Sequence, residues 1–132
     1  MRKVLSVLAM IAVLLLAVPS AHAQSYGQVA STLKDDTWQV HVNKQVQIAA
    51  DLTSGLGRDQ PFAYIVQVLD QNGVVIQLSW LTGTLTAGQS LSPSQSWTPA
   101  APGNYTAQIF VWSGIDNPNA LSPPLTMKIS VT

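Results

Sequence analysis

The sequence has no cysteine and no glutamate, and it carries few charges: six Lys or Arg and six Asp in 132 residues. The lack of cysteine excludes disulfides and thiolate metal sites. The lack of glutamate removes the bidentate ligand that closes an EF-hand calcium loop. Only four bases, Lys34, Lys44, Arg58 and Lys128, lie beyond residue 3, and they are scattered. Because nucleic-acid binding requires clustered positive charge, we expect no nucleic-acid partner.

The N-terminus has the three parts of a signal peptide. Arg2 and Lys3 are followed by the apolar run Val4–Val18 and then by the small residues of Ala21–Ala23. This order is typical of a secretory signal, and the run is shorter than the ~20 residues of a membrane-spanning helix. We therefore expect cleavage after Ala23, a secreted or cell-envelope location and no membrane span in the mature chain. The alternative is an uncleaved N-terminal anchor.

The rest of the chain is organised around a predicted hairpin. The apolar runs Phe62–Leu69 and Val74–Trp80 flank Asn72-Gly73, a pair that favours a two-residue type I′ turn because both residues accept a positive φ. Asp70 and Asn72 also resemble the start of a calcium loop, but the later acidic ligands of such a loop are missing. The sequence therefore predicts a turn here without a bound ion.

Further runs of alternating apolar and polar residues predict strands on both sides of this hairpin. Pro93 interrupts one of them and places it at a sheet edge, because proline cannot donate to a ladder. The predicted strands are Trp38–Val42, Gln45–Thr53, Gln89–Trp97, Tyr105–Trp112 and Leu125–Val131. With Leu81–Gly88 interpreted as turn residues, the domain spans residues 37–132. Residues 24–36 form an N-terminal segment without a clear pattern.

About seven short strands at spacings near ten residues are typical of an all-β, Ig-like antiparallel β-sandwich. Several short motifs resemble those of CARDB-type and related prokaryotic Ig-like, fibronectin III-like domains of surface proteins. These motifs are Val46-x-Ile48-x-Ala50-x-Leu52-Thr53, Asp70 to Gly73, Ala87-Gly88-Gln89-Ser90, Trp97-Thr98-Pro99 and Pro102-Gly103-x-Tyr105. The resemblance implies an extracellular adhesion or assembly module, a class that typically has no catalytic residues. The long segment Ser113–Pro124 departs from this pattern.

Few residues could support chemistry. His41 is the only histidine beyond residue 23, so a transition-metal site would lack its usual partners. Asp35 and Asp36 are sequence neighbours and do not form a facing pair, and no Gly-x-Ser-x-Gly elbow occurs. We expect no enzyme activity and no cofactor.

Two residues near the start of one predicted strand have specific interpretations. Tyr105 follows a Pro-Gly turn, where a tyrosine-corner lock to nearby backbone is expected. Asn104 begins an N-x-T sequon and is a candidate glycosylation site.

The strand Phe62–Leu69 is apolar on both faces, and Tyr105–Trp112 has aromatic residues on its outward parity. If these strands pair, an outward apolar surface forms, and the neighbouring loop extends it. The candidate surface consists of Ile65, Leu69, Phe110, Trp112, Ile115 and Asp116. Alternatively, residues 24–36 or the loop 113–124 fold over it. Trp80 and Trp97 are expected in the core, because a sandwich needs large buried side chains.

The sequence thus predicts a non-enzymatic exported module for protein–protein interaction, either with a protein partner or by self-association in cell-surface assembly or adhesion. One alternative is a carbohydrate- or peptide-binding module in which Trp112 stacks on the ligand. Another is a small protease inhibitor that presents the proline-stiffened loop Ser113–Pro124.

Overall fold

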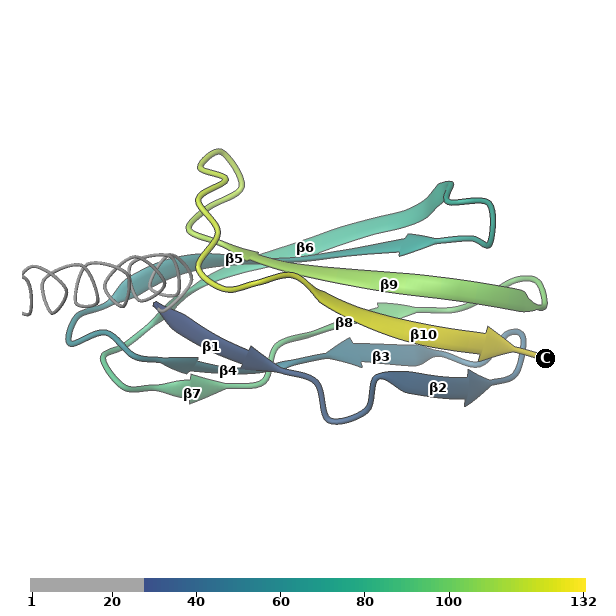
Figure 1. Cartoon of the computed structure of the whole chain (residues 1–132), viewed down its shortest axis with the longest axis horizontal. Coiled ribbons are helices and arrows are strands. Elements are labelled where there is room, and N and C mark those ends of the chain that lie inside the picture. The colour runs from purple at the N-terminus through teal and green to yellow at the C-terminus, as the bar shows by residue number, and fades with distance from the viewer. Residues whose placement is uncertain (1–27) are drawn as a thin grey trace, which may run out of the picture.

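A computed structural model of the chain describes residues 28–132, which form ten strands and contain no helix (Figure 1). The predicted signal peptide and its cleavage site lie outside the described residues. Within the described range, no helix is long and apolar enough to cross a membrane. The strands are β1 (Val29–Thr32), β2 (Thr37–Val40), β3 (Val46–Ala49), β4 (Asp51–Ser54), β5 (Gln60–Leu69), β6 (Val75–Leu85), β7 (Ser90–Leu91), β8 (Ser94–Trp97), β9 (Gly103–Trp112) and β10 (Leu125–Val131).

The strands form two layers. One layer is a five-stranded sheet in the order β2-β10-β9-β5-β6, and the other consists of the sheets β1-β4-β7 and β3-β8 (Figure 1). The ten strands belong to seven extended segments, because β3 continues into β4, β7 into β8, and β1 and β2 are joined by a short crossing. The all-β sandwich expected from the sequence is confirmed.

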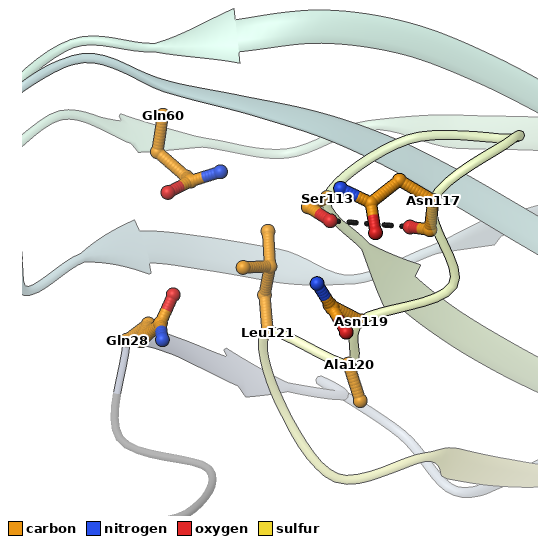
Figure 2. Close-up of a pocket in the computed structure, with 7 residues that line it drawn as sticks. All are labelled: Gln28, Gln60, Ser113, Asn117, Asn119, Ala120 and Leu121. Carbon is orange, nitrogen blue, oxygen red and sulfur yellow. Dashed lines mark hydrogen bonds between the residues drawn. The ribbon is translucent and has the colours of Figure 1, made fainter.

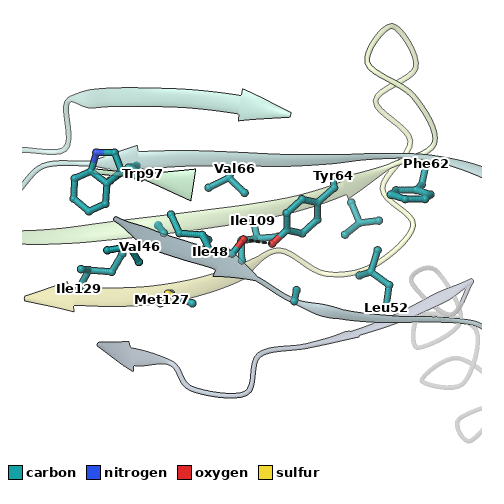
Figure 3. Close-up of a cluster of buried hydrophobic side chains, with 14 of the residues drawn as sticks. Val46, Ile48, Leu52, Phe62, Tyr64, Val66, Trp97, Ile109, Met127 and Ile129 are labelled. Carbon is teal, nitrogen blue, oxygen red and sulfur yellow. Dashed lines mark hydrogen bonds between the residues drawn. The ribbon is translucent and has the colours of Figure 1, made fainter. Parts of the chain in front are cut away.

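Alternation of side chains along each strand builds the core between the layers, as Figure 3 shows. Alternate residues of β5, β9 and β10 are buried, and burying each large apolar side chain contributes ~1.5–3 kcal/mol. The predicted inward sets are buried or nearly so: Val46, Ile48, Ala50 and Leu52; Phe62, Tyr64, Val66 and Val68; Tyr105, Ala107, Ile109 and Val111; Met127, Ile129 and Val131.

Tyr64 of β5 joins the two layers. Its hydroxyl donates a hydrogen bond to the backbone oxygen of Ile48 in the opposite layer, with an O–O distance of 2.9 Å (Figure 3). The side chain is fully buried, and this burial raises the pKa of Tyr64 well above its ordinary value. The hydrogen bond satisfies a hydroxyl that would otherwise be costly to bury.

The predicted strand Gln45–Thr53 is divided at Ala50 into β3 and β4, which pair with different partners. Opposite this break, Pro93 separates β7 from β8, and the Ala50 N–H donates to the Pro93 carbonyl at 3.3 Å. Proline has no N–H to continue a ladder, so the partner strand breaks at the same place. The predicted edge position of the segment Gln89–Trp97 is confirmed.

The central hairpin is present, but the prediction of a type I′ turn is wrong. Gly73 has a φ of 80°, whereas Asn72 is not among the residues with positive φ. The Gly73 N–H donates to the Asp70 carbonyl at 3.0 Å, and the Asp70 Oδ1 accepts from the N–H groups of Asn72 and Val74. The Asp70 N–H donates to the Val74 carbonyl at 2.9 Å and closes a three-residue loop. The register shift between Val68 and Leu69 is a separate bulge at Ile76 of β6. The side chain of Asp70 thus serves the turn.

The prediction that Leu81–Gly88 holds turn residues is wrong for its first half, because β6 continues to Leu85. Leu81 pairs with Tyr64, and Leu85 pairs with Gln60. A Cβ added at Gly83 would lie 3.1 Å from the ring of Phe62, so the missing side chain lets this ring lie against the strand. The threonines on either side of the glycine are β-branched and favour the extended backbone.

One pair of strands departs from the expected antiparallel arrangement. β2 runs parallel to β10, with Trp38 opposite Ile129. The cause is the crossing after β1: β1 pairs with β4 in one layer, and the chain then passes to the edge of the other layer. Val29 of β1 is buried in the core, so part of the segment 24–36 belongs to the sandwich.

Candidate interaction surface

The candidate surface is built on β5, which pairs with β6 on one side and with β9 on the other. Ile65 lies opposite both Trp80 and Phe110, so three apolar side chains form a row across three strands. Because Tyr64 and Val66 point into the core, Ile65 and its row point outward.

Neighbouring positions enlarge this row. Trp112 of β9 lies opposite Ala63, and the ring centroids of Phe110 and Trp112 are 6.1 Å apart with the planes tilted by 50°. Leu78 lies opposite Gln67, whose Nε2 donates to the Gln108 side-chain oxygen. A hollow of about 380 Å³ results. We call its apolar lining the apolar patch: Ile65, Leu78, Trp80, Phe110, Trp112 and Ile115.

Much of the apolar patch is open to solvent. Leu78 is 55% exposed and Trp80 is 52% exposed, whereas Ile65 in the middle is only 7% exposed. The flanking side chains therefore shield Ile65, and the patch forms a small outer apolar cluster. Clustered exposed apolar residues on a soluble domain mark contact surfaces.

The loop 113–124 forms one end of the hollow. Ser113 N–H donates to Asn119 O at 2.9 Å, and Leu121 N–H donates to Val111 O at 2.8 Å, so the loop closes on itself. Ile115, which is 42% exposed, is the loop residue that lines the hollow. The loop does not fold over Trp80. β1, the described strand of the segment 24–36, lies in the other layer, so within residues 28–132 neither expected cover buries the patch.

The structure brings together four of the six predicted surface residues: Ile65, Phe110, Trp112 and Ile115. Leu69 lies farther along β5, opposite Thr106, and does not line the hollow. Asp116 is exposed on the loop and also does not line it.

The expectation that Trp80 lies in the core is wrong. Its pairing with Ile65 places it on the outward parity of β6. Trp97 is buried as expected, with its ring centroid 4.9 Å from that of Tyr105.

Leu78 and Trp80 of β6 were not predicted as surface residues, although the sequence contains a signal for them. Between Asp70 and Asp116 no Asp, Glu, Lys, Arg or His occurs. This stretch includes β6, β7, β8 and β9. An exposed strand normally carries charged side chains, so their absence over four strands indicates an electrically neutral surface.

A second hollow, of about 500 Å³, lies at the end of the sandwich beside the loop (Figure 2). Its polar lining consists of carboxamides and a hydroxyl, without any charge. Gln60 Nε2 donates to the Pro61 carbonyl at 2.7 Å, and Ser113 Oγ donates to the Asn117 carbonyl at 3.1 Å. The lining residues are Gln28, Gln60, Ser113, Asn117, Asn119, Ala120 and Leu121.

The other residues singled out in the sequence are His41, Tyr105 and Asn104, and none of them lines either hollow described above. His41 Nδ1 lies 3.0 Å from Thr132 Oγ1, and within residues 28–132 no three His, Cys, Asp or Glu side chains gather in one place. The Tyr105 hydroxyl donates to the Ala101 carbonyl at 2.8 Å, which is the predicted tyrosine-corner lock. Asn104 is exposed near the start of β9.

No family model and no curated protein matches the sequence. Solved structures do match. The crystal structure of the CARDB domain of a Pyrococcus furiosus protein, in complex with di-metal ions, is 20% identical over 81% of this chain and 94% of its own, with a TM-score of 0.59. The solution NMR structure of that CARDB domain is 22% identical over 80% of this chain and 93% of its own, with a TM-score of 0.56.

A β-glucuronidase of glycoside hydrolase family 2 is 10% identical over 80% of this chain, with a TM-score of 0.55. The match covers only 11% of that enzyme, so it concerns one β-sandwich portion of a much larger protein. The two CARDB matches, in contrast, cover nearly the whole of the matched domain. The described chain therefore has the fold of a CARDB-type β-sandwich, as its sequence motifs predict.

Proposed function

We propose that this protein is a non-enzymatic, exported interaction module that binds a protein partner at the cell surface through the apolar patch. The observation that carries this proposal is the row of Trp80, Ile65 and Phe110 across three paired strands, in which Trp80 is 52% exposed. The N-terminal signal-peptide pattern supports export, and the CARDB-type fold is compatible with a role in surface assembly or adhesion.

The composition of the patch suits a protein interface. Aromatic residues are enriched and charged residues depleted at the buried centres of such interfaces. Trp80, Phe110 and Trp112 supply three aromatic anchors around a hollow that a partner side chain can fill. Because they lie on paired strands, these anchors are largely preorganised, and little conformational entropy is lost when a partner binds.

Residues 28–132 do not offer the donor set of a di-metal site. The structurally similar Pyrococcus furiosus domain was solved in complex with di-metal ions. In residues 28–132 of this chain, no cluster of three His, Cys, Asp or Glu side chains offers such a donor set. We therefore assign no role to a metal ion in this module.

Site-specific photo-cross-linking in the native host tests the proposal. A benzophenone amino acid is placed at Phe110, and the matched control is Ser96, an exposed residue on the outer face of the opposite layer. We expect one reproducible protein adduct from position 110, none from position 96, and loss of the adduct when Trp112→Ala is added. The same adducts from both positions, or an adduct that Trp112→Ala leaves unchanged, would rule out the patch as the binding surface.

A carbohydrate- or peptide-binding function is a second candidate, supported by the hollow in Figure 2. Carboxamides and hydroxyls donate and accept hydrogen bonds without charge, which suits a neutral, hydroxyl-rich ligand. A glycan array tests this candidate. We expect binding to be lost in Asn119→Ala and kept in Phe110→Ser; the reverse result would return the binding to the patch.

A further inference from the structure

β6 forms a free edge of the five-stranded sheet. It is an 11-residue strand, and within the described residues its backbone hydrogen bonds go only to β5. The N–H and C=O groups that point away from β5 therefore have no backbone partner there. An exposed row of this kind is a template for pairing with another strand.

The other sheet edges in residues 28–132 are protected by the usual devices. β7 has two residues, and β1, β2, β3 and β8 have four each. Lys34, Asp35 and Asp36 precede β2 closely. Short length and nearby charge both discourage edge-to-edge pairing. β6 is long and carries no charge; its bulge at Ile76 and the neighbouring β8 lie at its first residues, and from Gln77 to Leu85 it pairs regularly with β5.

We propose that β6 pairs antiparallel with β6 of a second copy of this chain, about a two-fold axis at Ser79. The absence of charge permits a second copy as the occupant, and the alternation of Leu78 and Trp80 on the outer face of β6 favours it. Because no charged side chain occurs between Asp70 and Asp116, two copies do not repel each other along this edge, and the edge carries no charge that would select an oppositely charged strand.

The side chains of β6 are self-complementary in this register. Leu78 lies opposite Trp80 of the second copy on the outer face, and Trp80 lies opposite Leu78, giving two apolar cross-strand pairs. Ser79 lies opposite its own counterpart. Its side chain lies on the inner face of the sheet, where Oγ is buried within its own chain, so the contact across the axis is made by backbone groups.

An antiparallel pair about this axis keeps the outer faces of both copies on the same side. The two apolar patches therefore become parts of one continuous surface. The pairing does not rest on the proposed partner binding, because backbone groups of β6 make it, whereas Phe110 and Trp112 lie two strands away on β9.

Cysteine cross-linking of the full chain tests the axis, since the natural sequence has no cysteine. Ser79→Cys places the two thiols opposite each other, within the Cα separation of roughly 4.4–6.8 Å that a disulfide requires. The control is Thr84→Cys, an exposed position on the same strand. In this register Thr84 faces Val74 of the second copy, so the two Thr84 lie about ten residues apart, or ~30 Å.

We expect mild oxidation to give at least tenfold more disulfide dimer with Ser79→Cys than with Thr84→Cys, measured on non-reducing gels at equal concentration. A charge at the edge should break the pair. Leu78→Lys, at a position open to solvent, should weaken dimerisation at least tenfold in sedimentation equilibrium while the circular-dichroism spectrum stays unchanged. Trp112→Ala should leave the dimer intact and remove only the partner cross-link from position 110.

Three results would each overturn β6 pairing about Ser79. They are a monomer at every concentration tested, equal cross-linking of the two cysteine variants, and a Leu78→Lys dimer as tight as that of the natural chain. If the chain dimerises but position 110 gives no adduct with a protein partner, only the proposed function would be overturned.

Discussion

The two outer faces of this sandwich obey the same alternation but carry opposite side chains. On the face of the second layer, Thr53 Oγ1 and Ser90 Oγ lie 3.0 Å apart, and Ser94 Oγ donates to Gln47 Oε1 at 3.2 Å. On the face of the five-stranded sheet, the equivalent outward positions hold the apolar patch. The inward set of each strand already supplies the core, whereas Leu78, Trp80 and Ile115 of the apolar patch are exposed. This is why we assign the patch a role in binding.

The largest expected difference between the two faces is the loss of stability when one outward side chain of each face is truncated. Ile65→Ala should lower the free energy of unfolding by about 3 kcal/mol, because Ile65 is buried beneath its neighbours although it points outward. Thr53→Ala on the other outer face should change it by less than ~0.5 kcal/mol. Urea denaturation measures both. Equal losses would mean that the patch is not a packed cluster.

The next largest effect is expected from removing the hydrogen bond between Tyr64 and Ile48, which joins the two layers. Tyr64→Phe removes the hydroxyl donor to Ile48 O and should cost about 1 kcal/mol. Burial raises the pKa of Tyr64, so only the unfolded chain loses this proton just above pH ~10, and stability should fall there.

The measurement is denaturant unfolding at pH 8 and at pH 10.5, comparing the natural chain with Tyr64→Phe. The difference between the two proteins should shrink as the pH rises. A difference that does not depend on pH would show that Tyr64 titrates normally in the folded state.

A smaller effect is expected for an exposed anchor. Trp80→Ala should cost only about 0.5–1 kcal/mol, the worth of a cross-strand pair, because its side chain is half exposed. The same change should remove most binding of a hydrophobic fluorescent dye. Gln47→Ala, on the polar outer face, is the matched control and should leave dye fluorescence unchanged. Equal fluorescence from both variants would show that the dye does not report the patch.

The smallest effect should come from the amide pair beside the patch. Gln67→Leu with Gln108→Leu replaces both hydrogen-bonding partners by apolar groups, which is nearly neutral, within about 1 kcal/mol. Gln67→Leu alone leaves the other amide without its partner and should be less stable than the double variant. Thermal unfolding of the three proteins checks this order, which would be contradicted if the single variant were the most stable.

Much of the fold could be predicted, because burial follows parity within a strand. The alternation of Val46, Ile48, Ala50 and Leu52 already identifies the side that faces the core. The outward placement of Phe110 and Trp112 follows from the same rule. The sequence motifs also indicated the CARDB-type sandwich that the structural matches share.

Other predictions were wrong where residue type was used as a guide to burial. Trp80 was expected in the core because a sandwich needs large buried side chains, but its pairing with Ile65 places it on the outward parity of β6. The parallel pairing of β2 with β10 depends on a crossing between layers, which periodicity does not report.

The sequence by itself determined most of the strands, the inward sides of β3, β4, β5, β9 and β10, and the absence of charge from Gln71 to Ile115, since these follow from residue type and local spacing. Only the tertiary structure decided that Trp80, Ile65 and Phe110 lie in one row and that β6 ends the sheet with a free edge. The reason is that strand order and register arise from contacts between residues far apart in the chain, which no local pattern encodes.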